Sequence, residues 1–545
     1  MTRGRRRASS WGTLGTYMAL FLCGAAYLAA GIRRPLNVYD EGLILHGAER
    51  VLLGELPYRD FWTVYAPGQY FMLAGLFRLF GSKVLVARAY DTLVRAALAL
   101  MGYYLTRKAA SSAWGLGAWA FLVAWLGFFE FYLYPAYLAL TLCLVAVLWL
   151  WQACDRQPPE SGRWWWLAGG ALGAATLFRH DFGAYGVAVA LAVGGAWIWR
   201  EGRGQPGQIT RMLRSWGRLL GGVLLVAGPV YAWLALAVGL ETLWDQLVWF
   251  PATKFAEVRD LPFPRPTGPI LSPSFWEECL AYLPYYAPVI LAVVGLFLAI
   301  WRLTRRDKPT AAWVVWASVS VLSLLLFQQA RVRSDLVHNV QMLVLVPMVM
   351  VGLARGMGRS PDVARVGVSV VVGALAIMML AHPFRERRQL WQAGFPWTKA
   401  PASAIAKAYP VPIDRQLEAV AQRVRSLTEP QERIYVGVGT HEKVFVNEPL
   451  IYFLADRVAG TRYHELHPGQ ATTREVQREI VADLERHDVR IIVISTRFDG
   501  VREPNASAIP SGVRDLDQYI RATYAVVEEV GPYRILTRKA GLASG

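Results

Sequence analysis

The stretch "WGTLGTYMALFLCGAAYLAAGIRRPLNVYDEGLILHGAERVLLGELPYRDFWTVYAPGQY" runs from Trp11 to Tyr70 and decides the fold class. Its first part, up to Ile32, is an uncharged apolar run that is long enough to cross a bilayer as a helix. An acidic pair, Asp40 and Glu41, follows soon after the run ends. The sequence therefore predicts a membrane protein that places two carboxylates just beyond its first span.

The segment after the acidic pair has the pattern of an amphipathic helix that ends before Gly54. From Asp40 to Leu53, apolar residues recur every three or four positions and polar residues occupy another face. The segment is too short to cross a bilayer, so we expect it to lie in the membrane interface with its apolar side toward the lipid. A second interfacial helix is expected at 69–81, so that residues 33–83 form an outer interfacial loop.

The composition extends this interpretation to most of the chain. Of the 545 residues, 54% are hydrophobic and 18% are charged, whereas soluble proteins carry about 25% charged residues. We predict a polytopic α-helical membrane domain at 1–382 and a soluble C-terminal domain at 383–545. About eleven membrane-spanning helices are expected, at 11–32, 84–106, 112–128, 135–152, 164–179, 183–199, 219–239, 283–301, 310–327, 338–354 and 366–382.

The net charge of +17 comes mainly from Arg residues in short loops between apolar runs. This placement is typical of topology signals in a membrane protein and argues against nucleic acid as a partner. Basic residues exceed acidic ones in the loops that lie inside when the N-terminus is cytoplasmic. We therefore expect a multi-pass protein of the cell membrane with a cytoplasmic N-terminus and an extracytoplasmic C-terminal domain.

After Pro383 the pattern changes to alternating strands and helices. Such alternation predicts a small α/β domain, and we expect it to act as a lid or as a docking module for an acceptor. The predicted elements are strands at 433–439 and 490–496, helices at 448–458, 472–489 and 513–524, and a terminal hairpin at 525–539.

In this topology, unusual polar residues from several loops face the outer side of the membrane together with Asp40 and Glu41. They are Arg179 and Asp181 between the fifth and sixth spans, Lys254 and Arg259 in the loop 245–269, and Arg331, Arg333 and His338 between the ninth and tenth spans. Their convergence on one face is what a site at the outer leaflet requires.

Structural explanations of the same residues stay open. Asp40 could also be an ordinary N-cap of a helix, with Glu41 in the first turn, where a carboxylate is favourable. The two arginines after the ninth span could anchor a helix end at the interface, and Arg179 with Asp181 could close a hairpin as an ion pair. Tyr65 could anchor the outer loop in the interface or stack on a sugar.

The first span, the acidic pair, the interfacial helix and the motifs PYRDF (57–61) and YAPGQYF (65–71) together resemble the glycosyltransferase C superfamily. The pattern is most similar to bacterial relatives of the lipid A aminoarabinose transferase and the protein O-mannosyltransferases, and it covers residues 11–382. The resemblance implies an inverting enzyme that transfers a sugar from a polyprenyl-phosphate donor to a hydroxyl acceptor on the outer side. The acceptor is a lipid, a glycan or a protein.

The resemblance also implies roles for the outer residues. Asp40 would be the catalytic base, with Glu41 beside it, because an attacking hydroxyl must lose a proton. A divalent metal on this pair is an open alternative. The expected holders of the donor phosphate are Arg331, Arg333, His338 and Arg179. The expected substrate contacts are Asp181, Tyr65, Lys254 and Arg259.

A transporter or flippase of a lipid-linked sugar is the main alternative function. Such a protein would need ionisable groups near the middle of the membrane and related halves with discontinuous helices. The apolar runs are nearly free of charge at their centres, apart from the second span with Asp91 and Arg95, and no repeat between halves is evident. The enzyme interpretation is therefore preferred.

Overall fold

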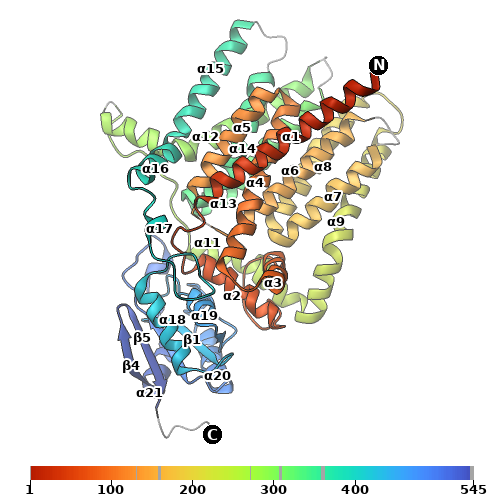
Figure 1. Ribbon diagram of the computed structural model, residues 1–545. Helices are drawn as coiled ribbons and strands as arrows, with labels where there is room; N and C mark the ends of the chain where they lie inside the picture. The colour runs from red at the N-terminus through yellow and green to blue at the C-terminus, as the bar shows by residue number, and fades with distance from the viewer. Residues whose placement is uncertain are drawn as a thin grey trace.

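The computed structural model describes residues 2–130, 132–156, 161–270, 272–305, 310–356 and 362–539. Figure 1 shows long helices lying side by side in a bundle, with a smaller unit of helices and strands at one end. The C-terminus belongs to this smaller unit, and the N-terminus lies at the far end of the bundle. The chain is thus a helical membrane protein that carries an α/β unit on one side, as the sequence predicts.

The bundle contains a helix at each of the eleven positions where a span is predicted. Eight of these helices, all except α4, α5 and α7, are long and apolar enough to cross a membrane. The eleven helices are α1 (Thr2–Ala29), α4 (Val84–Ala109), α5 (Ser112–Phe128), α6 (Ala136–Asp155), α7 (Ser161–Phe178), α8 (His180–Glu201), α9 (Gln208–Val238), α12 (Pro273–Thr304), α13 (Ala312–Val332), α14 (Leu336–Gly356) and α15 (Asp362–Met379).

Helix α4 carries charged residues in its first half, and the structure pairs them inside the protein. The Arg95 Nε lies 2.7 Å from Asp91 Oδ2, and both side chains are buried. Arg95 Nη1 also donates to the carbonyls of Leu126 and Phe129, each at 2.7 Å. These charges therefore join α4 to the end of α5 and do not face the lipid.

The outer loop contains the two short helices that the sequence predicts, α2 (Asp40–Leu52) and α3 (Gly68–Phe80). The expectation that the apolar side of α2 faces lipid is wrong, because this side packs against α3 and against α19 (Leu450–Ala455) of the C-terminal unit. Gly42 permits this close approach: a Cβ built there would lie 2.3 Å from the backbone N of Leu450. Helix α3, in contrast, exposes Leu79 and Phe80 at its end, as an interfacial helix would.

The predicted loop 245–269 is helical in its first half. Helix α10 (Leu240–Trp244) leads into it, and it contains two short π-helices at Asp245–Trp249 and Pro251–Phe255 and α11 (Ala256–Val258). The buried Gln246 fixes this segment to the outer loop by accepting from Thr63 N at 3.0 Å and donating to Tyr58 O at 3.2 Å. The segment then reaches Arg259, which is thereby held next to the outer loop.

After the bundle, helices α16 (Ala381–Gln392) and α17 (Pro396–Lys399) lead into the α/β unit. Its five-stranded sheet has the order β2-β1-β3-β5-β4, in which β2, β1 and β3 are parallel and β5 pairs antiparallel with both β3 and β4. The elements are α18 (Arg415–Leu427), β1 (Arg433–Val438), α19, β2 (Val458–Ala459), α20 (Arg474–Arg486), β3 (Ile491–Ser495), a 3-10 turn at Ala506–Ala508, α21 (Asp515–Thr523), β4 (Tyr524–Val530) and β5 (Tyr533–Arg538).

The predicted α/β pattern of this unit is confirmed, with two differences. The helix expected at 448–458 ends at Ala455, and the short strand β2 follows it. Helix α18 has no counterpart in the prediction. The carboxyl ends of the parallel strands β1 and β3 lead into loops that contact the membrane bundle.

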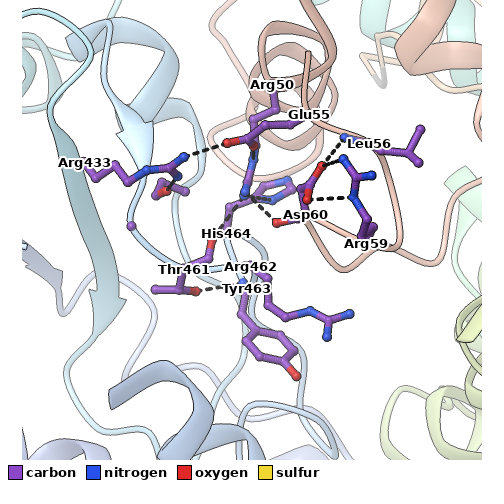
Figure 2. Close-up of polar contacts among 12 residues, drawn as sticks. Arg50, Glu55, Leu56, Arg59, Asp60, Arg433, Thr461, Arg462, Tyr463 and His464 are labelled. Atoms are coloured by element: carbon purple, nitrogen blue, oxygen red, sulfur yellow. Dashed lines mark hydrogen bonds and ion pairs between the residues drawn. The ribbon is translucent and has the colours of Figure 1, made fainter. Parts of the chain in front are cut away.

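Figure 2 shows how charged side chains join the outer loop to the α/β unit. Glu55 accepts from Arg50 of α2 and from Arg433 of β1, the latter at 3.0 Å. Arg50 is 2% exposed and also donates to Thr461 O at 3.2 Å and to Asp60 O at 2.7 Å. Because unpaired buried charges are costly, this network fixes the α/β unit over α2.

Candidate active site

Asp40 is the first residue of α2, and the residues before it set its orientation. Asn37 Oδ1 accepts from Asp40 N at 2.8 Å, and Asn37 Nδ2 donates to Asp40 Oδ2 at 2.8 Å. In return, Asn37 N donates to Glu41 Oε2 at 2.9 Å. This reciprocal pattern satisfies free N–H groups at the helix start, as a capping box does. Asn37, and not Asp40, is thus the capping side chain.

Glu41 points away from Asp40 and into the protein. Its carboxylate is 0% exposed and accepts from Arg88 of α4 at both oxygens, at 2.8 and 2.7 Å. Arg88 also donates to the carbonyls of Ile32 and Arg34 at 2.6 Å each. Glu41 therefore ties the start of α2 to the first span and to α4, and its oxygens are already occupied by Arg88.

Asp40 is only partly buried and keeps one oxygen free of the Asn37 contact. Burial raises the pKa of Asp40 to about 6, although the Asn37 hydrogen bond and the charges of His338 and Arg259 lower it. The carboxylate is therefore mostly ionised at neutral pH and more basic than an ordinary aspartate. These properties suit a group that accepts a proton.

Arg259 and Arg333 meet at one carboxylate of the C-terminal unit. Glu503 Oε1 accepts from Arg333 Nη2 at 2.6 Å, and Glu503 Oε2 accepts from Arg333 Nη1 at 3.0 Å. Arg259 Nη1 lies 3.8 Å from the same Glu503 Oε2, and Arg259 also donates to the carbonyl of Phe445. Burial lowers the pKa of Arg259, while the negative charges of Glu503 and Asp40 act in the opposite direction.

His338 is placed by the N-terminal end of α14. Asp335 Oδ1 accepts from His338 N at 2.8 Å and contacts His338 Nδ1 at 2.7 Å. The Nε of Arg333 lies 3.1 Å from Asp335 Oδ2, so the same aspartate orients both Arg333 and His338. His338 thereby lies within electrostatic range of Asp40.

Arg179 and Asp181 form a bidentate ion pair at the start of α8, with distances of 3.0 and 2.7 Å. Arg179 also donates to the Tyr134 hydroxyl at 3.1 Å. Tyr65 is within electrostatic range of both this pair and the start of α2: burial raises the pKa of Tyr65, the charge of Asp40 raises it further, and the charge of Arg179 lowers it. We use the name Asp40 cluster for the set Asp40, Tyr65, Arg179, Asp181, Arg259, Arg333, Asp335, His338 and Glu503.

Two of the candidate residues lie outside this cluster. Arg331 is exposed and donates to Gln328, one turn earlier in α13, at 3.2 Å. Lys254 is also exposed, and its Nζ lies 3.4 Å from Glu257 Oε2. Each therefore has the contacts of an ordinary surface residue.

The structure adds residues that the sequence alone did not single out. Tyr39 precedes Asp40, and its hydroxyl contacts His467 Nε2 of the C-terminal unit at 2.9 Å. The same Nε2 lies 2.7 Å from Glu465 Oε1, and both side chains are buried. Their sequence signal is the stretch "HELH" at 464–467, in which two histidines flank a glutamate and a leucine. Glu503 lies in an ordinary polar loop and carries no sequence signal.

The arrangement does not fit a metal held by Asp40 and Glu41 together. Arg88 bonds to both oxygens of Glu41, which leaves Asp40 as the only available carboxylate of the pair. Within the residues that the structure describes, no group of three or more His, Cys, Asp or Glu side chains is placed to hold a metal ion. We therefore assign no step to a metal.

No protein-family model matches the chain, and no curated protein matches it in sequence. The crystal structure of ArnT from Cupriavidus metallidurans bound to undecaprenyl phosphate is similar over 98% of this chain and 99% of that chain, with a TM-score of 0.54 and 13% identity. The apo oligosaccharyltransferase of Archaeoglobus fulgidus is 12% identical and matches 88% of this chain and 69% of that chain, with a TM-score of 0.46.

The arabinofuranosyltransferase AftD from Mycobacteria is 14% identical and matches 97% of this chain and 42% of that chain, with a TM-score of 0.48. The similarity to ArnT extends over nearly the whole of both chains, including the α/β unit. The chain therefore shares the overall fold of this ArnT structure.

Proposed function

We propose that this protein is a membrane glycosyltransferase that moves a sugar from a polyprenyl-phosphate donor to a hydroxyl acceptor. One arrangement carries the proposal: Asp40 is a partly buried carboxylate whose pKa is raised by burial to about 6, and it lies within electrostatic range of the Arg259 guanidinium and of His338. A basic group next to positive charge is what the reaction needs, since one side must accept a proton and the other must bind a phosphate. The fold shared with a structure that binds undecaprenyl phosphate supports the donor class.

In the proposed reaction, the acceptor hydroxyl attacks the anomeric carbon while Asp40 takes its proton. The bond from the anomeric carbon to the phosphate oxygen breaks, and the electron pair leaves with the polyprenyl phosphate. This anion is already stable, so no general acid is required. Arg259, Arg333 and Arg179, together with His338, stabilise its charge. A single displacement of this kind inverts the anomeric configuration.

The reaction is proposed to take place on the outer side of the membrane. The excess of basic residues in the loops on the other side supports a cytoplasmic N-terminus. The proposed membrane domain, 1–382, would then present the Asp40 cluster at the outer leaflet. The proposed extracytoplasmic domain, 383–545, would cover the cluster and help to receive a lipid, glycan or protein acceptor.

Glycan analysis in cells tests this function. In a strain that lacks the protein, mass analysis of surface glycans should reveal a missing sugar and an accumulated lipid-linked donor. Wild type should restore the sugar, and Asp40→Asn should not, at equal expression. Asp488→Asn is the control, because Asp488 is an exposed carboxylate that pairs with Arg538 near the sheet edge. Full restoration by Asp40→Asn would contradict the proposal.

A further inference from the structure

Glu503 is the one carboxylate of the Asp40 cluster that comes from the C-terminal unit. It makes a bidentate pair with Arg333 and lies 3.8 Å from Arg259, so it occupies the place between these two guanidinium groups. Burial raises the pKa of Glu503, but hydrogen bonds from Arg333 and Asn505 and the charge of Arg259 lower it overall. Glu503 is therefore ionised. An anion thus lies between the two arginines that we propose to bind a phosphate.

The charges of the Asp40 cluster disfavour the binding of another anion while Glu503 is in place. Its guanidinium groups are those of Arg179, Arg259 and Arg333, and its carboxylates are those of Asp40, Asp181, Asp335 and Glu503. The carboxylates therefore outnumber the guanidiniums by one. A phosphate added to this set would meet a net negative environment, which is unfavourable in a partly buried site.

Three of these carboxylates are fixed by helix ends. Asp40 is held by Asn37 at the start of α2, Asp181 is paired with Arg179 in the first turn of α8, and Asp335 accepts from His338 N at the start of α14. Moving any of them would disrupt a helix terminus. Each is therefore expected to stay in place when a ligand binds.

Glu503 is held differently. It lies in the loop 496–514 between β3 and α21, where the only regular element is the short turn Ala506–Ala508. The loop is attached to the bundle by Glu503 itself and by Asn505, which donates to Asp260 O at 2.8 Å. Loop residues can move without breaking a helix or the sheet, so Glu503 is the carboxylate that can leave at the lowest cost.

We propose that Glu503 acts as a stand-in anion that a lipid phosphate replaces between Arg259 and Arg333. This inference rests on the proposed function for the class of ligand, a phosphate group on a polyprenyl chain. The exchange removes one negative charge from the cluster and adds the charge of the phosphate. It also breaks the ion pair that helps to hold the loop 496–514 against the bundle, so that the donor's arrival loosens this loop near Asp40 and admits the acceptor.

The test measures the affinity of the purified full-length protein for undecaprenyl phosphate without any sugar. Glu503→Gln should bind it about tenfold more tightly than wild type. The uncharged amide pairs more weakly with Arg259 and Arg333, so it competes less with the phosphate for these two arginines. The matched control is Glu442→Gln: Glu442 is 13% exposed, close to the 12% of Glu503, and also pairs with an arginine, Arg514, but away from the cluster. It should bind like wild type. Thermal unfolding checks that both variants are folded.

A second readout needs no variant. Amide hydrogen exchange within 496–514 of the wild-type protein should become faster when undecaprenyl phosphate binds, and exchange in β1 and β3 should not change. The inference would be overturned if folded Glu503→Gln bound undecaprenyl phosphate no more tightly than wild type. It would also be overturned if amide exchange in the loop stayed unchanged or became slower.

The outcomes separate this inference from the proposed function. If sugar transfer does not depend on Asp40 but Glu503→Gln binds more tightly, the proposed mechanism is wrong and the anion exchange stands. If transfer depends on Asp40 and Glu503→Gln has no effect, the exchange alone is wrong. Failure of wild type and of Glu503→Gln to bind undecaprenyl phosphate would contradict both.

Discussion

Asp40 and Glu41 are adjacent in sequence, yet their carboxylates have different surroundings. Successive residues of a helix point about 100° apart, so the first turn of α2 directs Asp40 toward the cluster and Glu41 toward Arg88. Glu41 has both oxygens occupied by a guanidinium, whereas Asp40 has one oxygen free of the Asn37 contact. The pair therefore divides into a proposed base and a residue that positions it.

The pKa of Asp40 predicts a pH dependence. Burial is the main cause that raises this pKa to about 6, and only the ionised form can accept a proton. We expect kcat/KM for sugar transfer to be constant above this value and to fall as the pH decreases through it. The donor phosphodiester does not titrate in this range. A profile that stays flat between about pH 5 and 7 would contradict the assignment.

Glu41→Gln should destabilise the protein because it leaves Arg88 buried without its anion. Breaking one side of a buried ion pair costs about 3–5 kcal/mol, which thermal unfolding of the purified protein in detergent would reveal. Glu130→Gln is a suitable control, since Glu130 is 64% exposed and its pair with Arg34 is expected to contribute under about 1 kcal/mol. Equal stabilities of the two variants would show that Glu41 does not fix α2.

For single residues, the sequence predicts which residue types belong to the site better than it predicts their contacts. Asp40, Arg179, Arg259 and Arg333 do lie in one cluster, because polar groups at the ends of spans on one side share a membrane face. Exposed positions such as Arg331 have the same local pattern and could not be separated from them. Residues brought by the C-terminal unit, such as Glu503, could not be found at all because their placement depends on tertiary packing.

Among the elements, α2 shows what an amphipathic pattern determines and what it leaves open. Its period correctly predicts a helix from Asp40 to Leu52. The pattern requires only that the apolar face be covered, and it does not distinguish lipid from another part of the protein. Here α19 covers that face, and His46 stacks on Tyr452 with 4.7 Å between ring centroids. The predicted interfacial position therefore fails for α2.

The contact of α2 with α19 can be tested at two glycines. Gly42→Ala should lower the melting temperature and expose the C-terminal unit to protease, because its Cβ would lie 2.3 Å from Leu450 N. Gly75→Ala in α3 is the matched control: no atom lies within 4 Å of its Cβ, and alanine stabilises a helix interior by about 0.5–1 kcal/mol relative to glycine. If Gly42→Ala is as stable as Gly75→Ala, the close approach of the two helices is wrong.

For the whole molecule, the sequence determines the bundle because a bilayer imposes one length on every span. All eleven predicted spans correspond to helices, and the alternation of strands and helices after Pro383 gives the sheet. How the α/β unit docks on the bundle follows from contacts such as Arg433 with Glu55, which no local pattern contains. The parts of the site that depend on this docking were therefore not predictable.

The proposed orientation can be measured by labelling single cysteines in intact cells. In a variant without the native cysteines, Asp488→Cys in the α/β unit should react with a membrane-impermeant maleimide. Arg203→Cys lies between α8 and α9 and should react only after the membrane is permeabilised. Both positions are exposed, so access to the reagent depends on the side of the membrane. The reverse pattern would place the Asp40 cluster at the inner leaflet.

Turnover by the purified Asp40→Asn variant is the sharpest test of whether Asp40 accepts the proton during transfer. The donor is the lipid-linked sugar isolated from native membranes, supplied at saturating concentration. The account predicts a loss of at least about 100-fold in kcat, with undecaprenyl phosphate bound as tightly as by wild type or slightly more tightly. Turnover close to that of wild type, from a variant that binds undecaprenyl phosphate normally, would contradict it.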